Sequence, residues 1–285
     1  MVDAVERARG TGTITATGKR RSVTDNSNLQ NIVFPSLKDR VIIITGAGQG
    51  IGRVFAKSFA MAGARVVIAE RNEKTAAAVA TEIMKADGQA LAITTDIADP
   101  ASIDEMIKLV EDEYGHIDVL INNAAIFSTL QMRPFEQIPL EEWEQVLRVN
   151  ITGTFLCACA VLPAMRRAKW GRIINMASGA VSLGRPGYLH YIASKSALIG
   201  MSRSMARELG PDNITVNAIL PGATFTEIER KTVTPQQKER IIAMQCIPRA
   251  ETPEDLVGTA MFLASESSAF VTGQIINADG GATHP

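Results

Sequence analysis

The chain has 285 residues, of which 46% are hydrophobic and 21% are charged. This composition excludes an intrinsically disordered chain and supplies enough apolar side chains for one large core. The 29 Lys and Arg residues nearly balance the 30 Asp and Glu residues. The overall charge therefore indicates neither a nucleic-acid partner nor an anionic membrane surface. The longest apolar runs, 41–44 and 155–165, are also shorter than the ~20 residues of a membrane span.

Residues 1–36 are predicted to be a flexible N-terminal extension. The stretch 11–18 is rich in Thr and Gly, and a basic cluster follows at 19–21. Such a segment cannot build a core of its own. A short strand at 13–17 that pairs with another sheet edge is the alternative. Because no continuous apolar run follows a basic start, we expect no secretory signal and a cytoplasmic location.

The three cysteines are too few and too scattered for a disulfide framework. Cys157 and Cys159 lie in an apolar helical stretch, where their spacing of two puts them on different helix faces. Free cysteines are commonly buried, so we expect structural thiols in a reducing compartment.

From residue 37 onward, short β-branched runs alternate with longer helical patterns. The strand-like runs are 41–44, 64–69, 90–95, 119–121, 173–176, 214–219 and 274–277. The helical patterns are 51–62, 73–85, 100–114, 151–165, 191–209 and 253–264. Apolar strands that alternate with helices indicate a parallel sheet covered on both faces. The sequence thus predicts one doubly wound α/β domain over 37–285, with an irregular segment, 223–248, that is typical of an active-site lid.

A glycine-rich turn joins the first predicted strand to the first helix. Residues 45–52 match T-G-x-x-x-G-x-G through Gly46, Gly50 and Gly52, whereas G-x-G-x-x-G does not match. Glycines allow backbone N–H groups to approach a pyrophosphate at a helix N-terminus. The strand before the turn and the helix after it favour a dinucleotide site, and a turn without ligand is the alternative.

Glu70 ends the second predicted strand, 24 residues after Gly46. An acidic residue there accepts hydrogen bonds from the adenosine ribose hydroxyls and repels a 2′-phosphate, which favours NAD over NADP. Arg71 beside it is suited either to stacking on adenine or to holding a phosphate. A solvated carboxylate at a strand end is the alternative for Glu70.

Tyr191 and Lys195 form the pattern Y-x-x-x-K. On a helix these residues lie on one face. A free phenol has a pKa of ~10, and a nearby ammonium favours the phenolate. The pair is therefore a candidate general acid or base. By itself the spacing is also compatible with an ordinary surface pair.

Further motifs follow in register. They are Asp96-Ile97 after the third strand, Asn122–Ala125, Val149-Asn150, Ser178 thirteen residues before Tyr191, Pro221–Thr226, Thr272–Gln274 and Asp279–Gly281. With the glycine turn and Y-x-x-x-K, they resemble the short-chain dehydrogenase/reductase family, in its group of ordinary length, over 37–281. The family's N-N-A-G has Ala125 in place of the last Gly here.

The resemblance implies a roughly seven-stranded Rossmann-type sheet, no metal site and a homotetramer. It implies four catalytic residues. Ser178 would bind the substrate oxygen, Tyr191 would transfer the proton, Lys195 would lower the Tyr191 pKa, and Asn150 would hold a relay water. The implied cofactor-binding residues are Gly46, Gln49, Gly50, Ile51, Gly52, Glu70, Arg71, Asp96, Ile97, Asn123, Ala124, Tyr191, Lys195, Pro221, Gly222, Thr224 and Thr226.

The expected function is hydride transfer between NAD(H), with NADP the less favoured cofactor, and a small secondary alcohol or ketone. An NADPH-dependent 3-oxoacyl-(acyl carrier protein) reductase is one alternative, and a non-catalytic dinucleotide-binding regulator is another. The expected substrate pocket is moderately apolar, with candidate lining residues Phe127, Ala180, Val181, Tyr188 and Phe225.

Overall fold

A single seven-stranded parallel sheet forms the centre of the computed structural model, which describes residues 34–228 and 234–284. This confirms the predicted fold class. The predicted strand at 13–17, and all but the last three residues of the predicted extension, lie outside the described residues. The strands are β1 Val41–Thr45, β2 Arg65–Glu70, β3 Gln89–Thr94, β4 Val119–Asn122, β5 Gly171–Met176, β6 Ile214–Pro221 and β7 Ile275–Ala278.

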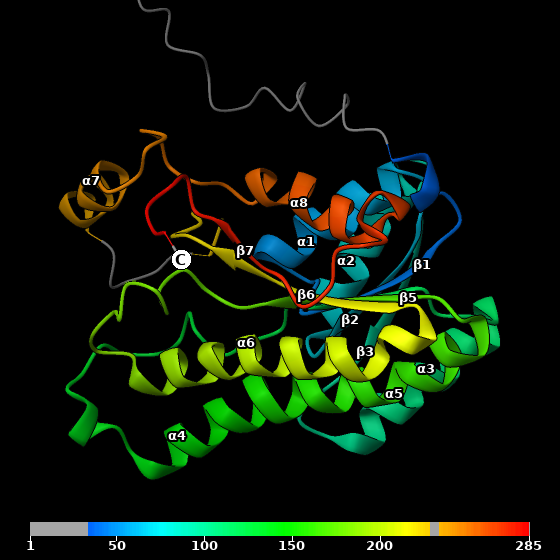
Figure 1. The fold of residues 1–285 in the computed structure, drawn as a ribbon, viewed down its shortest axis with the longest axis horizontal. Coiled ribbons are helices and arrows are strands. Elements are labelled where there is room, and N and C mark those ends of the chain that lie inside the picture. The colour runs from blue at the N-terminus through cyan, green and yellow to red at the C-terminus, as the bar shows by residue number, and fades with distance from the viewer. Residues whose placement is uncertain (1–33, 229–233, 285) are drawn as a thin grey trace, which may run out of the picture. The chain divides into compact units, whose positions relative to one another are not determined.

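The strands are arranged in the order β3-β2-β1-β4-β5-β6-β7, and helices cover both faces of the sheet. One layer contains α1, α2 and α8, and the other contains α3, α5 and α6 (Figure 1). Helix bounds are α1 Gly50–Met61, α2 Glu73–Met84, α3 Pro100–Tyr114, α4 Leu140–Leu147, α5 Thr154–Ala168, α6 Leu189–Leu209, α7 Pro235–Ala243 and α8 Glu254–Ala264. The carboxyl ends of all seven strands meet at one edge, because every pairing is parallel.

The structure adds two helices that the sequence patterns did not predict. One is α4, which has a single buried residue, Val146. A π-helical turn, Arg148–Gly153, joins α4 to α5. The other is α7, which lies inside the segment 223–248 and begins with a capping box of Thr234 and Gln237. Residues 229–233 lie outside the described residues, so a lid role for the whole segment stays a prediction.

The core consists of aliphatic side chains from the central strands and the helices above and below them. Every residue of β1, β4, β5 and β6 is buried. Cys157 is buried in this core, and its burial raises the pKa of the thiol to about 12. The expectation for Cys159 was wrong because this thiol is exposed. Helix positions i and i+2 point about 200° apart around the axis. Because Cys157 faces inward, Cys159 faces outward.

The continuous helical stretch Leu140–Ala168 is long and apolar enough to cross a membrane by length and composition alone, with a mean hydropathy of 1.6 over 18 residues. Buried helices of folded domains meet the same criterion. In this structure, its inner face includes Cys157, Val161 and Met165, which belong to the core beneath the sheet. One face of the stretch thus packs within the domain, and 39% of its most apolar window is buried.

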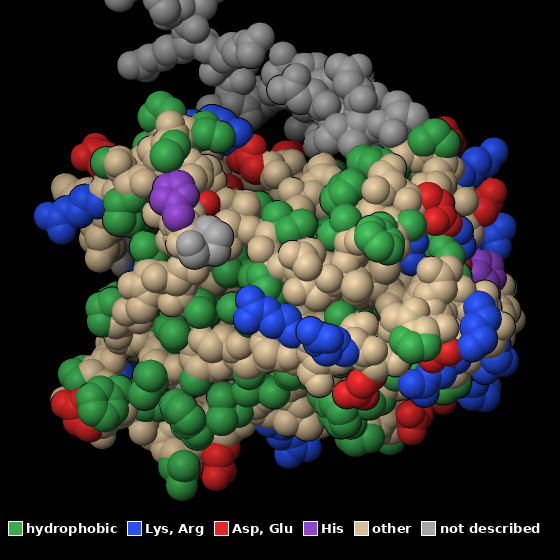
Figure 2. Space-filling view, in the orientation of Figure 1, with side chains coloured by type: hydrophobic (Ala, Val, Ile, Leu, Met, Phe, Trp, Pro, Cys, Tyr) green, Lys and Arg blue, Asp and Glu red, His purple; other side chains and the backbone are tan. Residues whose placement is uncertain are grey.

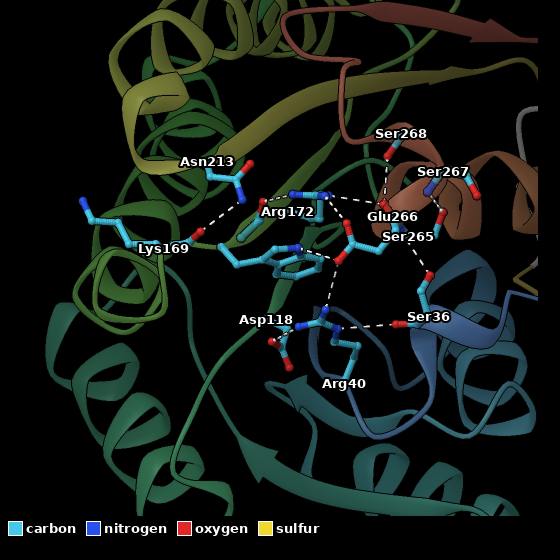
Figure 3. A network of polar contacts seen from close by, with 12 residues as sticks. Ser36, Arg40, Asp118, Lys169, Arg172, Asn213, Ser265, Glu266, Ser267 and Ser268 are labelled. Carbon is cyan, nitrogen blue, oxygen red and sulfur yellow. Dashed lines mark hydrogen bonds and ion pairs between the residues drawn. The ribbon is translucent and has the colours of Figure 1, made fainter.

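At the opposite edge from the strands' carboxyl ends, a polar cluster joins β1, β5 and the segment after α8 (Figure 3). The guanidinium groups of Arg40 and Arg172 lie 3.8 and 4.2 Å from the Trp170 ring. Glu266 accepts hydrogen bonds from Trp170 Nε1 at 2.9 Å, Arg40 Nη2 at 3.2 Å and Arg172 Nη2 at 3.5 Å. Arg172 is fully buried, and this burial lowers its pKa. Glu266 is thus the counterion of a buried cation.

We expect Glu266→Gln to lower the free energy of unfolding by about 1.5–3 kcal/mol, because it leaves the buried Arg172 guanidinium without a counterion. Urea denaturation at neutral pH measures this change. Glu136→Gln, at an exposed position, controls for the loss of one carboxylate. Equal stability of the two variants would contradict this role for Glu266.

Candidate functional site

A cavity of about 790 Å³ opens at the carboxyl ends of the strands. Strands β2 and β3 lie on one side of β1, and β4 lies on the other side of β1. The strand order therefore reverses between β1 and β4, which makes this gap a topological switch point. The structure brings most of the predicted site residues to this cavity. Those that line it are Gly46, Gln49, Gly50, Ile51, Glu70, Arg71, Asp96, Ile97, Asn123, Ala124, Ser178, Tyr191, Lys195, Pro221, Gly222, Thr224 and Thr226. Gly52 and Asn150 are not among the lining residues.

The glycine turn is held by close backbone packing. Gly46 has a positive φ of 65°, which favours glycine. A Cβ on Gly52 would lie 2.3 Å from Gly46 O, so a side chain there would displace the turn. Asn123 Nδ2 donates hydrogen bonds to Thr45 O at 3.0 Å and Gly46 O at 3.1 Å. Gly52 thus shapes the cavity by packing behind it.

The N-terminus of α1 faces the cavity and already binds an anionic group of the chain itself. Gly50 N donates a hydrogen bond to Glu227 Oε1 at 2.9 Å. Arg53 Nη1 lies 3.8 Å from the same oxygen. Helix N-termini attract anions because their first N–H groups have no partner within the helix. The carboxylate of Glu227 therefore marks an anion position at the N-terminus of α1, beside Gly50 of the cavity lining.

Glu70, Arg71 and Asp96 line one end of the cavity. Glu70 Oε2 accepts from Gly48 N at 3.2 Å and Oε1 from Asn72 N at 3.0 Å. These two N–H groups orient the carboxylate at the end of β2, and each oxygen keeps a lone pair for a further donor. Glu70 is therefore held in place at the cavity edge and can still accept hydrogen bonds from a ligand.

Ser178, Tyr191 and Lys195 line the cavity where the loop after β5 meets α6. Phe127 stacks on the Tyr191 ring with centroids 4.2 Å apart. Lys195 Nζ lies 5.8 Å from the Tyr191 centroid and donates to Met176 O at 2.6 Å. Burial lowers the pKa of Lys195 to about 8. A phenol beside a buried ammonium is suited to proton transfer near neutral pH.

Asn150 is fully buried in the π-helical turn. Its Oδ1 accepts from Ile126 N at 2.8 Å, and its Nδ2 donates to Ile126 O at 3.3 Å and to Ser194 Oγ at 3.0 Å. The side chain therefore links the loop after β4 to the helix that carries Tyr191. Both amide hydrogens are used in these contacts, so a relay water on this side chain would donate to the second lone pair of Oδ1.

A buried carboxyl group, Glu251, lies behind the loop that follows β6 and was missed by the sequence analysis. Thr224 Oγ1 donates to Glu251 Oε1 at 2.7 Å, and Phe225 N donates to the Glu251 carbonyl at 2.8 Å. Burial raises the pKa of Glu251 to about 7, although hydrogen bonds from Thr224 and Gly222 oppose this change. Asp255 and Asp279 also raise it. Glu251 thus holds the loop whose residues line the cavity.

The residues that line the cavity differ in part from those expected for the substrate pocket. Phe127 and Ala180 line it as expected, whereas Val181, Tyr188 and Phe225 do not. Tyr188 is buried behind Phe127, with ring centroids 5.5 Å apart. Further lining residues come from the loop after β4, the loop before α6, and α7. They include Met132, Leu183, Arg185, Gln237, Arg240, Ile241 and Met244.

Comparisons with known proteins give a consistent result. A family model described as Enoyl-(Acyl carrier protein) reductase matches residues 46–283. A 3-oxoacyl-[acyl-carrier-protein] reductase of Synechocystis sp. is 39% identical over 249 residues, which are 86% of this chain and 98% of that protein. The "Probable galactose dehydrogenase GalD" of Rhizobium meliloti is 37% identical over 87% of this chain and 96% of its own length.

Solved structures are similar throughout the domain. The crystal structure of a 3-ketoacyl-(acyl-carrier-protein) reductase from Brucella melitensis complexed with NADH has a TM-score of 0.80 and 33% identity, over 87% of this chain and all of that one. A short-chain dehydrogenase/reductase mutant from Serratia marcescens also has a TM-score of 0.80, with 31% identity over the same shares of the two chains.

We expect the pKa of Glu251 to make stability depend on pH. Its pKa is about 7 in the folded protein and 4.5 ordinarily, so between these values the folded state binds more protons than the unfolded state. The free energy of unfolding therefore falls as pH rises from 4.5 to 7. The loss due to Glu251 is about 3 kcal/mol, at 1.36 kcal/mol per pKa unit. The variant Glu251→Gln has no titrating group at this position, so its stability should not fall with pH for this reason.

Urea denaturation at pH 5 and pH 8, at fixed protein concentration, measures the difference between Glu251→Gln and the unaltered protein. This difference should shift in favour of the variant at pH 8. Glu239→Gln, at an exposed position of α7, is the control. A difference that is the same at both pH values would show that Glu251 does not titrate in this range.

Proposed function

This chain belongs to the short-chain dehydrogenase/reductase family, and we propose that its cavity binds NAD(H) and transfers a hydride between that cofactor and a secondary alcohol or ketone. An NAD(P)-dependent oxidoreductase activity on such groups is what the family performs. The observation that carries the assignment to this cavity is that the glycine turn and the three reactive side chains, Ser178, Tyr191 and Lys195, line one continuous space.

The residues present suit a dinucleotide. The carboxylate of Glu227 at the N-terminus of α1 is a stand-in for a phosphate oxygen, because the same N–H and the nearby Arg53 favour any anion there. The missing Cβ of Gly52 allows the turn to lie close to that position. Residues 37–285 form the proposed catalytic domain. When bound, the nicotinamide supplies or accepts the hydride.

The protein's part is to bind, orient and exchange a proton. Tyr191 gives a proton to the substrate oxygen in reduction, or removes it in oxidation, and Ser178 donates a hydrogen bond to that oxygen. Lys195 is the nearby cation that favours the phenolate. Asn150 acts as a positioning residue through its hydrogen bonds to Ile126 and Ser194.

A non-catalytic dinucleotide-binding regulator, the other alternative, would not need Ser178, Tyr191 and Lys195 together in one cavity. A 3-oxoacyl thioester reductase remains the second candidate, because the Synechocystis and Brucella relatives have that name. An assay with a 3-oxoacyl thioester beside a panel of simple ketones distinguishes the two candidates.

We propose that the cofactor is NAD(H) in preference to NADP(H). The carboxylate of Glu70 is fixed at the edge of the cavity by Gly48 N and Asn72 N, where it suits ribose hydroxyls and repels a 2′-phosphate. The similar Brucella structure is described as a complex with NADH. Arg71 beside it is exposed, and it stacks on adenine in this proposal.

A homotetramer and a cytoplasmic location complete the proposal. Hydrophobic side chains gather over α4 and the adjoining parts of α5 and α6 on the face in Figure 2. Phe155 is 50% exposed and Leu140 is 63% exposed. Exposed apolar patches of this kind mark interfaces between proteins. Val161 on the same helix as Phe155 is fully buried within the domain and supports the core.

We expect Tyr191→Phe to lower kcat by about 10²–10⁴-fold, because the ring stays in place and only the acid–base hydroxyl is lost. NADH binding, followed by quenching of protein fluorescence, should persist. Tyr114→Phe on α3 is the matched control and should keep full turnover. Unchanged turnover of Tyr191→Phe would refute the proposed mechanism.

We expect kcat/KM with NADH to exceed that with NADPH by about 10-fold or more, because the 2′-phosphate would approach the Glu70 carboxylate. Glu70→Gln keeps the side-chain shape and should narrow the ratio. Glu73→Gln, exposed in the first turn of α2, should leave it unchanged. Comparable values for the two cofactors in the unaltered enzyme would overturn the proposed preference.

A further inference from the structure

Two arginines from separate segments of the chain line the cavity. Arg185 comes from the loop between β5 and α6, and Arg240 comes from α7. The Arg185 guanidinium carbon lies 5.2 Å from the Tyr188 centroid. Tyr188 packs on Phe127, which stacks on Tyr191. Arg185 is thus connected by aromatic contacts to the wall that carries the reactive phenol.

Neither guanidinium has an acidic partner among the residues that the structure describes, since none of their ion pairs includes Arg185 or Arg240. The acidic residues that line the cavity are Glu70, Asp96 and Asp279, and each already accepts hydrogen bonds from backbone N–H groups. Asp279 also accepts from Thr283 Oγ1 at 2.6 Å and is only 2% exposed. The cavity lining therefore includes two guanidinium groups without an ion pair to a described acidic residue, Arg185 half-buried and Arg240 exposed.

The surroundings of the two arginines limit the kind of anion. Gln237 lies one turn before Arg240 on α7, lines the same cavity and adds an amide donor. The lining also has apolar side chains from three segments, Met132, Leu183 and Met244. A ligand that satisfies both parts has an alkyl segment with an anionic group at its far end. A guanidinium binds a carboxylate in two parallel hydrogen bonds.

We propose that Arg185 and Arg240 form a carboxylate-binding subsite, and that the substrate is an oxo acid or the corresponding hydroxy acid. Its carbonyl or carbinol group lies at Ser178 and Tyr191, and its carboxylate lies between the two guanidinium groups. The reacting carbon is separated from the carboxylate by a short alkyl chain that contacts the apolar lining. This inference rests on the proposed function and adds the substrate class to it.

The first test compares acids with their own esters. The full chain, with NADH, is assayed with 4-oxopentanoate, 5-oxohexanoate and 6-oxoheptanoate and with the methyl ester of each. For at least one chain length, kcat/KM of the acid should exceed that of the ester by about 10-fold or more, and the difference should shrink as salt is added. Esters that react as well as acids at every length would overturn the subsite but leave the proposed reaction standing.

Variants assign the effect to the two side chains. Arg185→Gln and Arg240→Gln should each lower kcat/KM for the preferred acid by about 10–100-fold, mainly through KM, while the ester changes less than about 2-fold. Lys238→Gln is the matched control, because it removes one positive charge from the same helix at a side chain that lies over Phe225 and does not line the cavity. An equal loss for the ester would show a structural effect and overturn the assignment.

A binding measurement separates the subsite from the reaction. Calorimetry of hexanoate and hexanamide, with the cofactor-free protein and with NADH present, needs no turnover. Hexanoate should bind more tightly than hexanamide in at least one form, and both arginine variants should remove the difference. If the acid binds in this way but no oxo compound is reduced, the proposed function fails and the subsite stands. Equal binding of acid and amide overturns the subsite.

Discussion

The close packing of the glycine turn against the end of β4 is the constraint on which the site depends. A Cβ on Gly46 would lie 2.8 Å from Ala124 Cα, and a Cβ on Gly52 would lie 2.3 Å from Gly46 O. Only glycine permits this approach, and Asn123 ties the two segments with hydrogen bonds to Thr45 O and Gly46 O. The turn thereby directs the N-terminus of α1 at the switch point between β1 and β4.

The reactive side chains are held by a different set of buried contacts. Asn150 links the loop after β4 to α6, while Asn122 Nδ2 donates to Asn175 Oδ1 at 2.9 Å and Asn175 Nδ2 donates to Ser202 Oγ at 2.8 Å. These amides connect β4, β5 and α6 beneath the cavity. Buried side-chain hydrogen bonds of this kind favour one arrangement of the elements. The glycine turn and the side chains of Ser178, Tyr191 and Lys195 are therefore held at a constant separation.

Local patterns in the sequence were sufficient for most of the fold. Apolar runs and helical periodicity predicted all seven strands, and α3 matches its predicted bounds of 100–114. Helix α7 escaped prediction because none of its described side chains is buried, so it has no apolar periodicity toward a core. Cys159 was misplaced because composition alone does not tell which face of α5 packs inward.

Most of the predicted site residues share the cavity because they belong to local motifs, which lie at the carboxyl ends of strands or, for Tyr191 and Lys195, on one face of α6. Glu251 has no such motif, since its partner Thr224 lies 27 residues earlier and the contact exists only in the folded chain. Arg185 and Arg240 were missed for the same reason. Each is an ordinary arginine in the sequence, and only the fold places both on one cavity.

The contact between Glu227 and the N-terminus of α1 has a consequence for ligand selection. The protein provides its own monovalent anion at that position, so any ligand must exchange with it instead of filling a vacant charge. A lone carboxylate or halide gains little by such an exchange, because it offers the helix nothing that Glu227 does not. A diphosphate bridge offers more charge and more acceptor oxygens. In the proposed binding mode the site therefore selects by valence, and small singly charged anions compete poorly with the cofactor.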